Sequence, residues 1–169
     1  MSEMCGMKND CIIQTKRLLL REIREQDAKL IVKWRSDPDI YRYFKNPHTL
    51  TLEEHLYWYQ NQYRNNTDIV SWIANYMDQA YGLFSVKKEN HLTVEISYLL
   101  DPKGQGQGFA SEALQAVEEW AEKQWEIKCV VAQIHKANEK SIRFIKRNGY
   151  HLFNCNGSFC LFKKIVNGG

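Results

Sequence analysis

The chain has 169 residues, of which 44% are hydrophobic and 12% aromatic, and this suits a single domain with one core. The net charge of +3 is too small to indicate nucleic acid as a partner, and no apolar run approaches membrane-spanning length. Residues 1–11 form a polar stretch without the apolar core of a signal peptide, so we expect a flexible tail followed by one domain over 12–169.

The predicted elements alternate between β-rich runs and amphipathic segments. Thr51 and Glu54 form a capping box that should begin a helix, and Gly149 should end another. Strands are expected at 18–23, 68–76, 81–87, 92–100, 128–134, 151–153 and 159–166, and helices at 26–36, 51–64, 109–123 and 138–147.

The connections predict how these strands are paired. Short turns join the strands between 68 and 100, which indicates an antiparallel meander. The helix at 109–123 is a crossover, so the strand at 128–134 should run parallel to the one before it. The expected fold class is α/β (mixed α+β), a single domain whose mixed, mostly antiparallel sheet has about seven strands with about four helices on both faces.

The cysteines, at positions 5, 11, 129, 155 and 160, are odd in number and include no Cys-x-x-Cys pair. This argues against a disulfide framework or a zinc site, and we expect no metal and a reduced, cytoplasmic compartment. Cys129 starts an apolar strand, which favours a small core residue over a nucleophile.

The most informative passage is Asp101–Ala110, which has glycine at every second position from Gly104 to Gly108. A strand, a glycine turn and a helix start together make an anion site, because unpaired N–H groups of the first helical turn face the ligand. A dinucleotide fingerprint is excluded because the next strand has no acidic residue, and a P-loop because Phe109 follows the glycines. A tight turn without a ligand is the alternative.

Two motifs resemble the GNAT acetyltransferase superfamily. Its motif, Arg or Gln, two residues, Gly, one residue, then Gly or Ala, reads here Lys103–Gly108, with Lys103 in place of the usual first residue. A second block reads Asn138-x-x-Ser141-x-x-Phe144, followed by Gly149 and Tyr150. Together with the order of elements, the resemblance covers roughly residues 15 to 166.

The resemblance implies that acetyl-CoA is the co-substrate. The strand before the loop should bulge near Leu99 and Leu100 and separate from the strand at 128–134, so that the pantetheine arm lies between them. A backbone N–H of Leu99 or Leu100 should bind the thioester oxygen. The expected cofactor contacts are Leu99, Leu100, Lys103, Gly104, Gln105, Gly106, Gly108, Phe109, Ala110, Asn138, Ser141 and Arg143.

The family often uses a carboxylate on the cofactor-binding strand as the base, and Glu95 is the candidate here. The alternative is that Glu95 only faces solvent from a half-buried strand. His48 and His55 are further candidates, because histidine suits proton transfer near neutral pH. The tyrosine that usually returns a proton to the CoA thiolate is replaced by Ile145, so water or a tyrosine such as Tyr98 would have to serve.

Two segments, Leu30–Ile40 and Glu53–Tyr59, resemble the nucleotide-sugar N-acetyltransferases, which acetylate the 4-amino group of a UDP-linked deoxysugar. The basic and aromatic stretch Tyr41–Lys45, together with Arg35 and His48, could face such an acceptor, with arginine on the diphosphate and aromatic rings on uracil. The alternative is an ordinary core stripe with solvated charges. The expected substrate contacts are Arg35, Tyr41, Arg42, His48, His55 and Trp58.

Two other functions stay open. The same region also resembles the ribosomal-protein N-terminal acetyltransferases, whose acceptor is a peptide amine. Loss of the tyrosine at position 145 is compatible with a CoA-binding module that does no chemistry. We expect a small-molecule amine as the partner and no nucleic acid or membrane; a homodimer is compatible with the sequence.

Overall fold

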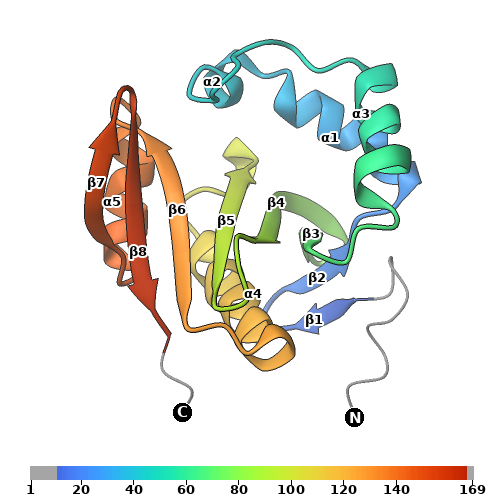
Figure 1. Ribbon diagram of the computed structural model, residues 1–169. Coiled ribbons are helices and arrows are strands. Elements are labelled where there is room, and N and C mark those ends of the chain that lie inside the picture. Colours follow the sequence, from blue (N-terminus) through green and yellow to red (C-terminus); the bar gives the residue numbers. More distant parts are fainter. Residues whose placement is uncertain (1–10, 167–169) are drawn as a thin grey trace.

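A computed structural model describes residues 11–166, which build one eight-stranded sheet in the order β1-β2-β3-β4-β5-β6-β8-β7 (Figure 1). Only β5 and β6 are parallel, and all other neighbours are antiparallel. The strands are β1 (Ile12–Gln14), β2 (Leu19–Glu22), β3 (Ile69–Tyr76), β4 (Gln79–Lys88), β5 (Thr93–Leu100), β6 (Cys129–His135), β7 (His151–Asn156) and β8 (Phe159–Ile165). The predicted meander and the parallel crossover are confirmed.

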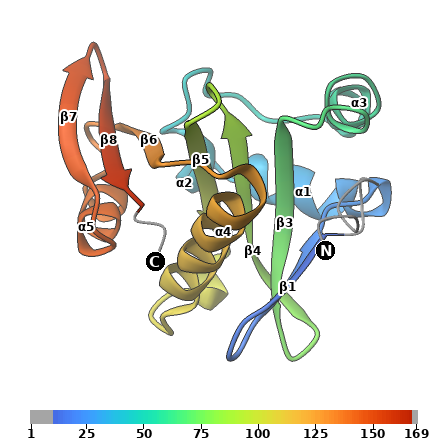
Figure 2. The same cartoon turned by 60° about the horizontal axis from the view of Figure 1, so that its bottom comes forward.

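Helices cover both faces of the sheet, as predicted. The helices α1, α2 and α3 lie on one side and the long α4 crosses the other, while α5 lies beside β7 and β8 (Figures 1 and 2). Their bounds are α1 (Ala28–Arg35), α2 (Pro38–Tyr41), α3 (Leu52–Trp58), α4 (Phe109–Trp125) and α5 (Glu139–Arg147). The sheet has one strand more and the fold one helix more than expected, because β1 and α2 are only three and four residues long.

The capping box at the start of α3 is confirmed. The Thr51 hydroxyl accepts a hydrogen bond from the Glu54 amide at 3.1 Å, and the Glu54 carboxylate accepts one from the Thr51 amide at 3.1 Å. A π-helical turn, Tyr59–Tyr63, continues this helix, so the predicted end near residue 64 holds as well. These bonds satisfy donors that would otherwise be orphaned at the helix start.

The sheet separates two apolar clusters. The larger one packs α4 against the sheet, with Trp72, Phe84, Val117 and Phe162 among its buried members. The smaller one packs α1 and the π-helical turn against the opposite face, with Leu99 contributed by β5. Because side chains alternate along a strand, Leu99 shows which face of β5 looks toward α1.

Two expectations were wrong. No bulge occurs in β5, whose register with β4 runs unbroken from Lys88↔Val94 to Gly82↔Leu100. The irregularities lie instead in the β3–β4 and β7–β8 pairs. Disulfides are also present, since Cys155 bonds to Cys160, its register partner across the β7–β8 hairpin. The odd count of cysteines could not exclude a pair that the hairpin brings together.

The expected N-terminal tail falls almost entirely outside the described residues. Residues 1–10 of the expected tail lie outside the described part of the chain. Cys11, by contrast, is buried in the larger cluster and disulfide-bonded, and its carbonyl accepts a hydrogen bond from the Glu22 amide at 2.9 Å. No helix within residues 11–166 is both long and apolar enough to cross a bilayer.

Candidate active site

The loop between β5 and α4 has the backbone shape that its glycines predict. Gly106 and Gly108 have φ of +81° and +77°, a region where residues with a side chain are strained. A Cβ on Gly104 would lie 3.0 Å from the Tyr81 ring, so glycine also lets the loop approach β4 closely. The alternating glycines therefore set both the turn and its packing.

Six consecutive amides of this loop are unpaired. Within the described chain, no hydrogen bond uses the N–H groups of residues 106 to 111 as donors, and the helix ladder begins after them. A Cβ added at Gly106 would meet nothing within 4 Å, so the space over the loop is open. Unpaired amides at the start of a 17-residue helix form a site for an anion such as a diphosphate.

The two parallel strands pair over only three residues. Thr93–Glu95 of β5 faces Cys129–Val131 of β6, and no further pairs follow toward the loop. In Figure 1 the ribbons of β5 and β6 are close at one end and diverge toward the other. The separation that the family resemblance implied is thus present without the bulge that was expected to cause it.

The ladder between β4 and β5 decides which β5 amides face this separation. The Asp101 amide donates to Tyr81 and the Glu89 amide to Thr93, each between register partners across the two strands. Antiparallel pairs alternate, so the N–H of Leu99 also points toward β4. The N–H groups of Tyr98 and Leu100 point to the open side instead. The amides of Leu99 and Leu100 were both expected to be able to bind the thioester oxygen. The expectation for Leu99 is therefore wrong, because its N–H faces β4, and Leu100 is favoured.

The side chain of Tyr98 links β5 to α5. Its hydroxyl lies 2.6 Å from the Ser141 hydroxyl, and its ring packs against Phe144. Burial raises the pKa of Tyr98 to about 12, even though the hydrogen bond to Ser141 acts in the opposite direction. The structure thus brings a protonated phenol beside Ser141, one helical turn before the buried Ile145.

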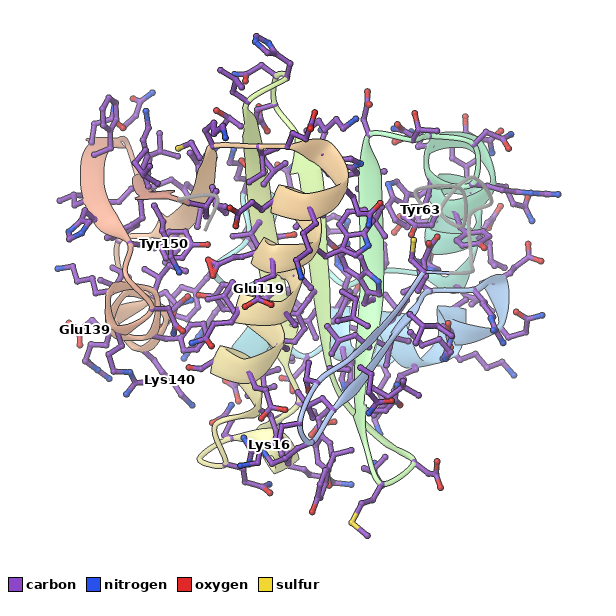
Figure 3. All side chains as sticks on the ribbon, turned by 90° about the horizontal axis from the view of Figure 1, so that it is seen from below. Lys16, Tyr63, Glu119, Glu139, Lys140 and Tyr150 are labelled. Carbon is purple, nitrogen blue, oxygen red and sulfur yellow. A yellow bond between two sulfur atoms is a disulfide. The ribbon has the colours of Figure 1, made fainter. Side chains whose placement is uncertain are left out.

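The start of α5 lies against the loop. The Asn138 side chain caps α5 by accepting from the Ser141 amide at 3.3 Å, and the Lys140 ammonium donates to the Gln105 side chain. Figure 3 labels Lys140 on α5. Arg143 points elsewhere, since its ion pair is with Glu139 and its side chain is mostly exposed. Asn138 and Ser141 therefore border the separated strands, whereas Arg143 borders solvent.

The face of the sheet toward α1 carries Glu95. Leu99, Ser97 and Glu95 share this face by alternation, and Glu95 accepts a hydrogen bond from Gln133 of β6 at 3.0 Å. This bond spans the two strands just where their pairing ends. Glu95 is therefore held at the closed end of the separation, with its carboxylate still reached by solvent.

A shallow hollow of about 470 Å³ lies one strand away from Glu95. Lys87, the register partner of Glu95, lines one side of this hollow. The remaining lining comes from α3, the α3–β3 connection and the start of β3: Trp58, Asn61, Gln62, Asn65, Asn66 and Ile69. The lining is rich in amide groups, which can both donate and accept hydrogen bonds. A molecule whose amine reaches Glu95 has room for a polar body in this direction.

Arg35, the last residue of α1, is a second cation on the α1 side of the sheet, besides Lys87. Its guanidinium lies over the Phe44 ring at 5.1 Å, and no carboxylate is paired with it among residues 11–166. Although solvent reaches the side chain, surrounding protein desolvates it and lowers the pKa of Arg35. An uncompensated, partly desolvated guanidinium is a favourable partner for an anion.

His55 is buried on α3, with 3% of its surface exposed. Its Nε2 has no hydrogen-bond partner within the described residues. Burial lowers the pKa of His55, and the nearby Arg35 charge lowers it further against the opposing effect of Asp27. The imidazole is therefore neutral at neutral pH, and its position fits packing better than direct contact with a substrate.

The other predicted acceptor residues lie apart from one another. Trp58 packs on Tyr63 and also lines the hollow. Arg42 lies over the Tyr43 ring and 4.0 Å from Asp39, both exposed, while the exposed His48 contacts the Asn46 carbonyl. Tyr41 ends α2, and no contact assigns it to the site. Of this set, His55 lies beside Trp58, with ring centroids 5.6 Å apart, and Arg35 is near enough to His55 to lower its pKa.

Comparison with known proteins identifies the family. Residues 17–151 match the model of the acetyltransferase (GNAT) domain, which is most of the chain. The chain belongs to the GNAT acetyltransferase family. It is an acetyl-CoA-dependent N-acetyltransferase, and no cluster of His, Cys, Asp and Glu in residues 11–166 is arranged to hold a metal.

Several GNAT proteins are similar along most of their length. The uncharacterized N-acetyltransferase YnaD of Bacillus subtilis is 30% identical over 139 residues, which is 81% of each chain. The acetyltransferase PseH of Campylobacter jejuni is 25% identical over 136 residues, covering 79% of this chain and 82% of that protein. The structure of the ribosomal L7/L12 α-N-protein acetyltransferase RimL in complex with coenzyme A is also similar, with a TM-score of 0.76 and 20% sequence identity. The match covers 92% of this chain and 98% of the RimL chain.

Several residues that shape this GNAT site were missed in the sequence. Gln133 holds Glu95, yet a glutamine in a strand gives no local signal of that role. Arg17 and Glu112 brace the loop from the β1–β2 turn, and no motif joins them because 95 residues separate them. Lys140 was missed for the same reason, although it lies within the Asn138-x-x-Ser141 block, because its partner Gln105 is 35 residues away.

Proposed function

We propose that this GNAT enzyme acetylates the 4-amino group of a UDP-linked deoxysugar by direct attack on acetyl-CoA. The observation that carries the cofactor half of this proposal is the run of unpaired amides at residues 106–111 beside two separated strands. Gly104, Gly106, Gly108 and the neighbouring Lys103, Gln105, Phe109 and Ala110 would hold the diphosphate, and Asn138 and Ser141 would border the pantetheine arm.

Acetyl-CoA supplies a thioester carbonyl, and the protein supplies orientation and proton transfer. Glu95 takes the proton of the acceptor amine, directly or through water, which is needed because alkyl amines are mostly protonated at neutral pH. The Leu100 or Tyr98 amide donates a hydrogen bond to the carbonyl oxygen as negative charge develops there. Holding both reactants in line can account for a large part of the rate, on the order of 7–11 kcal/mol in favourable cases.

The Tyr98 hydroxyl is the group that would return a proton to the leaving thiolate. It stays protonated because its pKa is raised to about 12, and it lies on β5 beside Ser141. This would replace the tyrosine that Ile145 displaces. A proton donor at Tyr98 would support catalysis despite Ile145, and it argues against a CoA-binding module that does no chemistry.

The acceptor is proposed from charge. Arg35 has no carboxylate partner among residues 11–166 and is partly desolvated, which favours an anionic acceptor such as a sugar nucleotide diphosphate. The amide-rich hollow beside Lys87 suits a hydroxyl-rich sugar. A polyamine is less favoured, because its charge has the same sign as Arg35.

A peptide amine is the second candidate acceptor. The fold of RimL, an α-N-protein acetyltransferase, matches this chain closely, though at an identity that carries the fold alone. An extended peptide would need a long groove, whereas the hollow one strand away from Glu95 is lined only by Trp58, the α3–β3 connection, Ile69 and Lys87 among residues 11–166. The acceptor's chemistry therefore has to be tested directly.

Release of CoA thiol from acetyl-CoA, measured across a panel of amines, tests the proposal. We expect turnover with UDP-linked 4-amino sugars and none with N-terminal peptides or spermidine. Turnover with peptides alone would overturn the acceptor assignment. Tight CoA binding without turnover on any amine would favour a binding module. Gly106→Trp should abolish CoA binding while the protein still folds, and unchanged affinity would refute the loop assignment.

The cellular location and the oligomeric state of the protein are also predictions. A cytoplasmic location is expected for an enzyme that draws on acetyl-CoA, and thiol trapping of Cys155 in cells would report the redox state there. A homodimer would be detected by light scattering of the purified protein.

A further inference from the structure

The turn between β1 and β2 contacts the helix that begins at the glycine loop. Arg17 Nε lies 2.8 Å from one carboxylate oxygen of Glu112, and the other oxygen accepts from the Arg17 amide at 2.8 Å and the Thr15 hydroxyl at 2.5 Å. Burial acts to raise the pKa of Glu112, but the bonds from Thr15 and Arg17 lower it overall. The carboxylate is thus ionised and holds the turn in place. Figure 3 labels Lys16 in this turn.

The same guanidinium also contacts the glycine loop. Nη1 of Arg17 donates to the Gln107 carbonyl at 2.8 Å, and the guanidinium lies 4.8 Å over the Phe109 ring. A Cβ on Gly108 would lie 3.2 Å from Nη2, so Arg17 occupies the space directly behind that residue. One side chain therefore joins the helix, the loop and the β1–β2 turn.

The contact between Arg17 and the Gln107 carbonyl fixes the direction of the Gly108 N–H, because both groups belong to the same peptide unit. In a planar trans peptide, the C=O of one residue and the N–H of the next point in opposite directions. Because the Gln107 carbonyl is bound to Arg17, the Gly108 N–H must point away from Arg17. If the carbonyl were released, the peptide could turn over and place an oxygen, rather than an N–H, toward an anion above the loop.

Arg17 is poorly arranged to be a ligand of the anion itself. Two of its nitrogens are already bonded, and its charge is compensated by Glu112 at 2.8 Å. Its contribution has to act through the Gln107–Gly108 peptide. This distinguishes it from the amides of residues 106–111, which donate no hydrogen bond within the described part of the chain.

We propose that Arg17 is a positioning residue for CoA, which directs the Gly108 amide at the diphosphate by holding the Gln107 carbonyl, with Glu112 and Thr15 fixing the guanidinium. The inference rests on the proposed role of the glycine loop in binding this diphosphate. It predicts that a residue about 90 positions before the loop determines cofactor affinity without touching the cofactor.

The test compares CoA affinity by titration calorimetry in Arg17→Ala, Arg17→Lys and wild type. Loss of one oriented hydrogen bond to a charged group should weaken CoA binding about 10- to 100-fold in Arg17→Ala. Arg17→Lys should not restore it, because an ammonium cannot bond Glu112 and Gln107 with a planar fork. Binding of pantetheine, which lacks the diphosphate, should stay within about twofold of wild type by the same reasoning.

Arg21→Ala is the matched control. Arg21 lies on β2 and pairs with Asp27 at 2.8 Å, so its loss removes an arginine–carboxylate pair of the same kind away from the loop. We expect it to lower the melting temperature like Arg17→Ala but to leave CoA affinity unchanged. In ligand-free protein, the amide NMR signal of Gly108 should shift in Arg17→Ala and not in Arg21→Ala.

These experiments test the role of Arg17 separately from the role of the glycine loop in CoA binding. If Arg17→Ala binds CoA like wild type while Gly106→Trp does not bind, the role of Arg17 is refuted and the loop assignment stands. If Gly106→Trp binds CoA normally, the loop assignment itself is refuted. Full rescue by Arg17→Lys would show that charge alone, and not orientation of the peptide, accounts for the effect, and would also refute the proposal. If Arg17→Ala does not fold, Thr15→Val provides the same comparison with a smaller expected loss.

Discussion

Gly106 and Gly157 offer a matched pair of substitutions that separates backbone strain from ligand contact. Both have positive φ, +81° and +63°, and a Cβ on either would meet no atom within 4 Å. Gly106 lies in the loop before α4, whereas Gly157 lies in the β7–β8 hairpin. Alanine at either position therefore adds the same kind of strain and differs only in location.

The magnitude follows from the backbone. A left-handed conformation costs a residue with a Cβ roughly 1–2 kcal/mol, and the stiffer unfolded chain returns about 0.4–1 kcal/mol. Both variants should thus lose about 1 kcal/mol, which for a chain of this size is a melting-temperature drop of about 2–4 °C. CoA affinity should separate them, because a methyl group in the diphosphate site disturbs one amide contact or more, about 10- to 100-fold.

Differential scanning fluorimetry without ligand and calorimetric titration with CoA measure the two effects. We expect similar melting temperatures for Gly106→Ala and Gly157→Ala, with weakened CoA binding only in the first. Equal CoA affinity in the two variants would show that the open space over Gly106 is not the diphosphate site, and the reasoning from the unpaired amides would fail.

Three further predictions concern the base, a buried carboxylate and the hairpin disulfide. Glu95→Gln should lower turnover about 10²- to 10⁴-fold, with a residual rate that rises with pH because the amine must lose its proton to solvent; an unaltered pH–rate profile would remove Glu95 from the mechanism. Burial raises the pKa of Glu118 above its ordinary 4.5 despite a hydrogen bond from Tyr150, so the native state binds the proton more tightly than the unfolded state. Wild-type stability in urea should therefore fall as pH rises through the interval above 4.5, and Glu118→Gln should lack that fall; parallel curves would contradict it. Cys155→Ser should remove up to about 2 kcal/mol of stability, given the short loop that the bond to Cys160 closes; chemical denaturation of this variant and the wild type measures the loss, and equal midpoints would contradict it.

Local sequence signals were reliable where the physics is local. The capping box of Thr51 and Glu54, the left-handed glycines of the loop and the Gly149 cap at φ +92° all occur where the residue types predict them. Each depends on backbone groups within a few residues, so no distant packing can easily override it. The order of the longer strands followed from turns and spacing in the same way.

The expectations that failed depend on contacts between distant segments. A bulge in β5 was expected as the cause of the strand separation, but the separation arises because β6 pairs fully with β8 and only briefly with β5. The assignment of the Leu99 amide failed because only the β4 register determines which N–H groups face outward. The Cys155–Cys160 bond required the hairpin register, which spacing alone does not give.

From its sequence alone, this chain is a single mixed domain with a glycine loop that can bind an anion ahead of a helix, because dihedral preferences and helix ends belong to individual residues. Tertiary structure alone decided that Gln133 holds Glu95, that Arg35 lacks a carboxylate partner among residues 11–166, and that Arg17 directs a peptide 90 residues away. These are relations between side chains that meet only after the sheet has formed, and no short-range pattern encodes them.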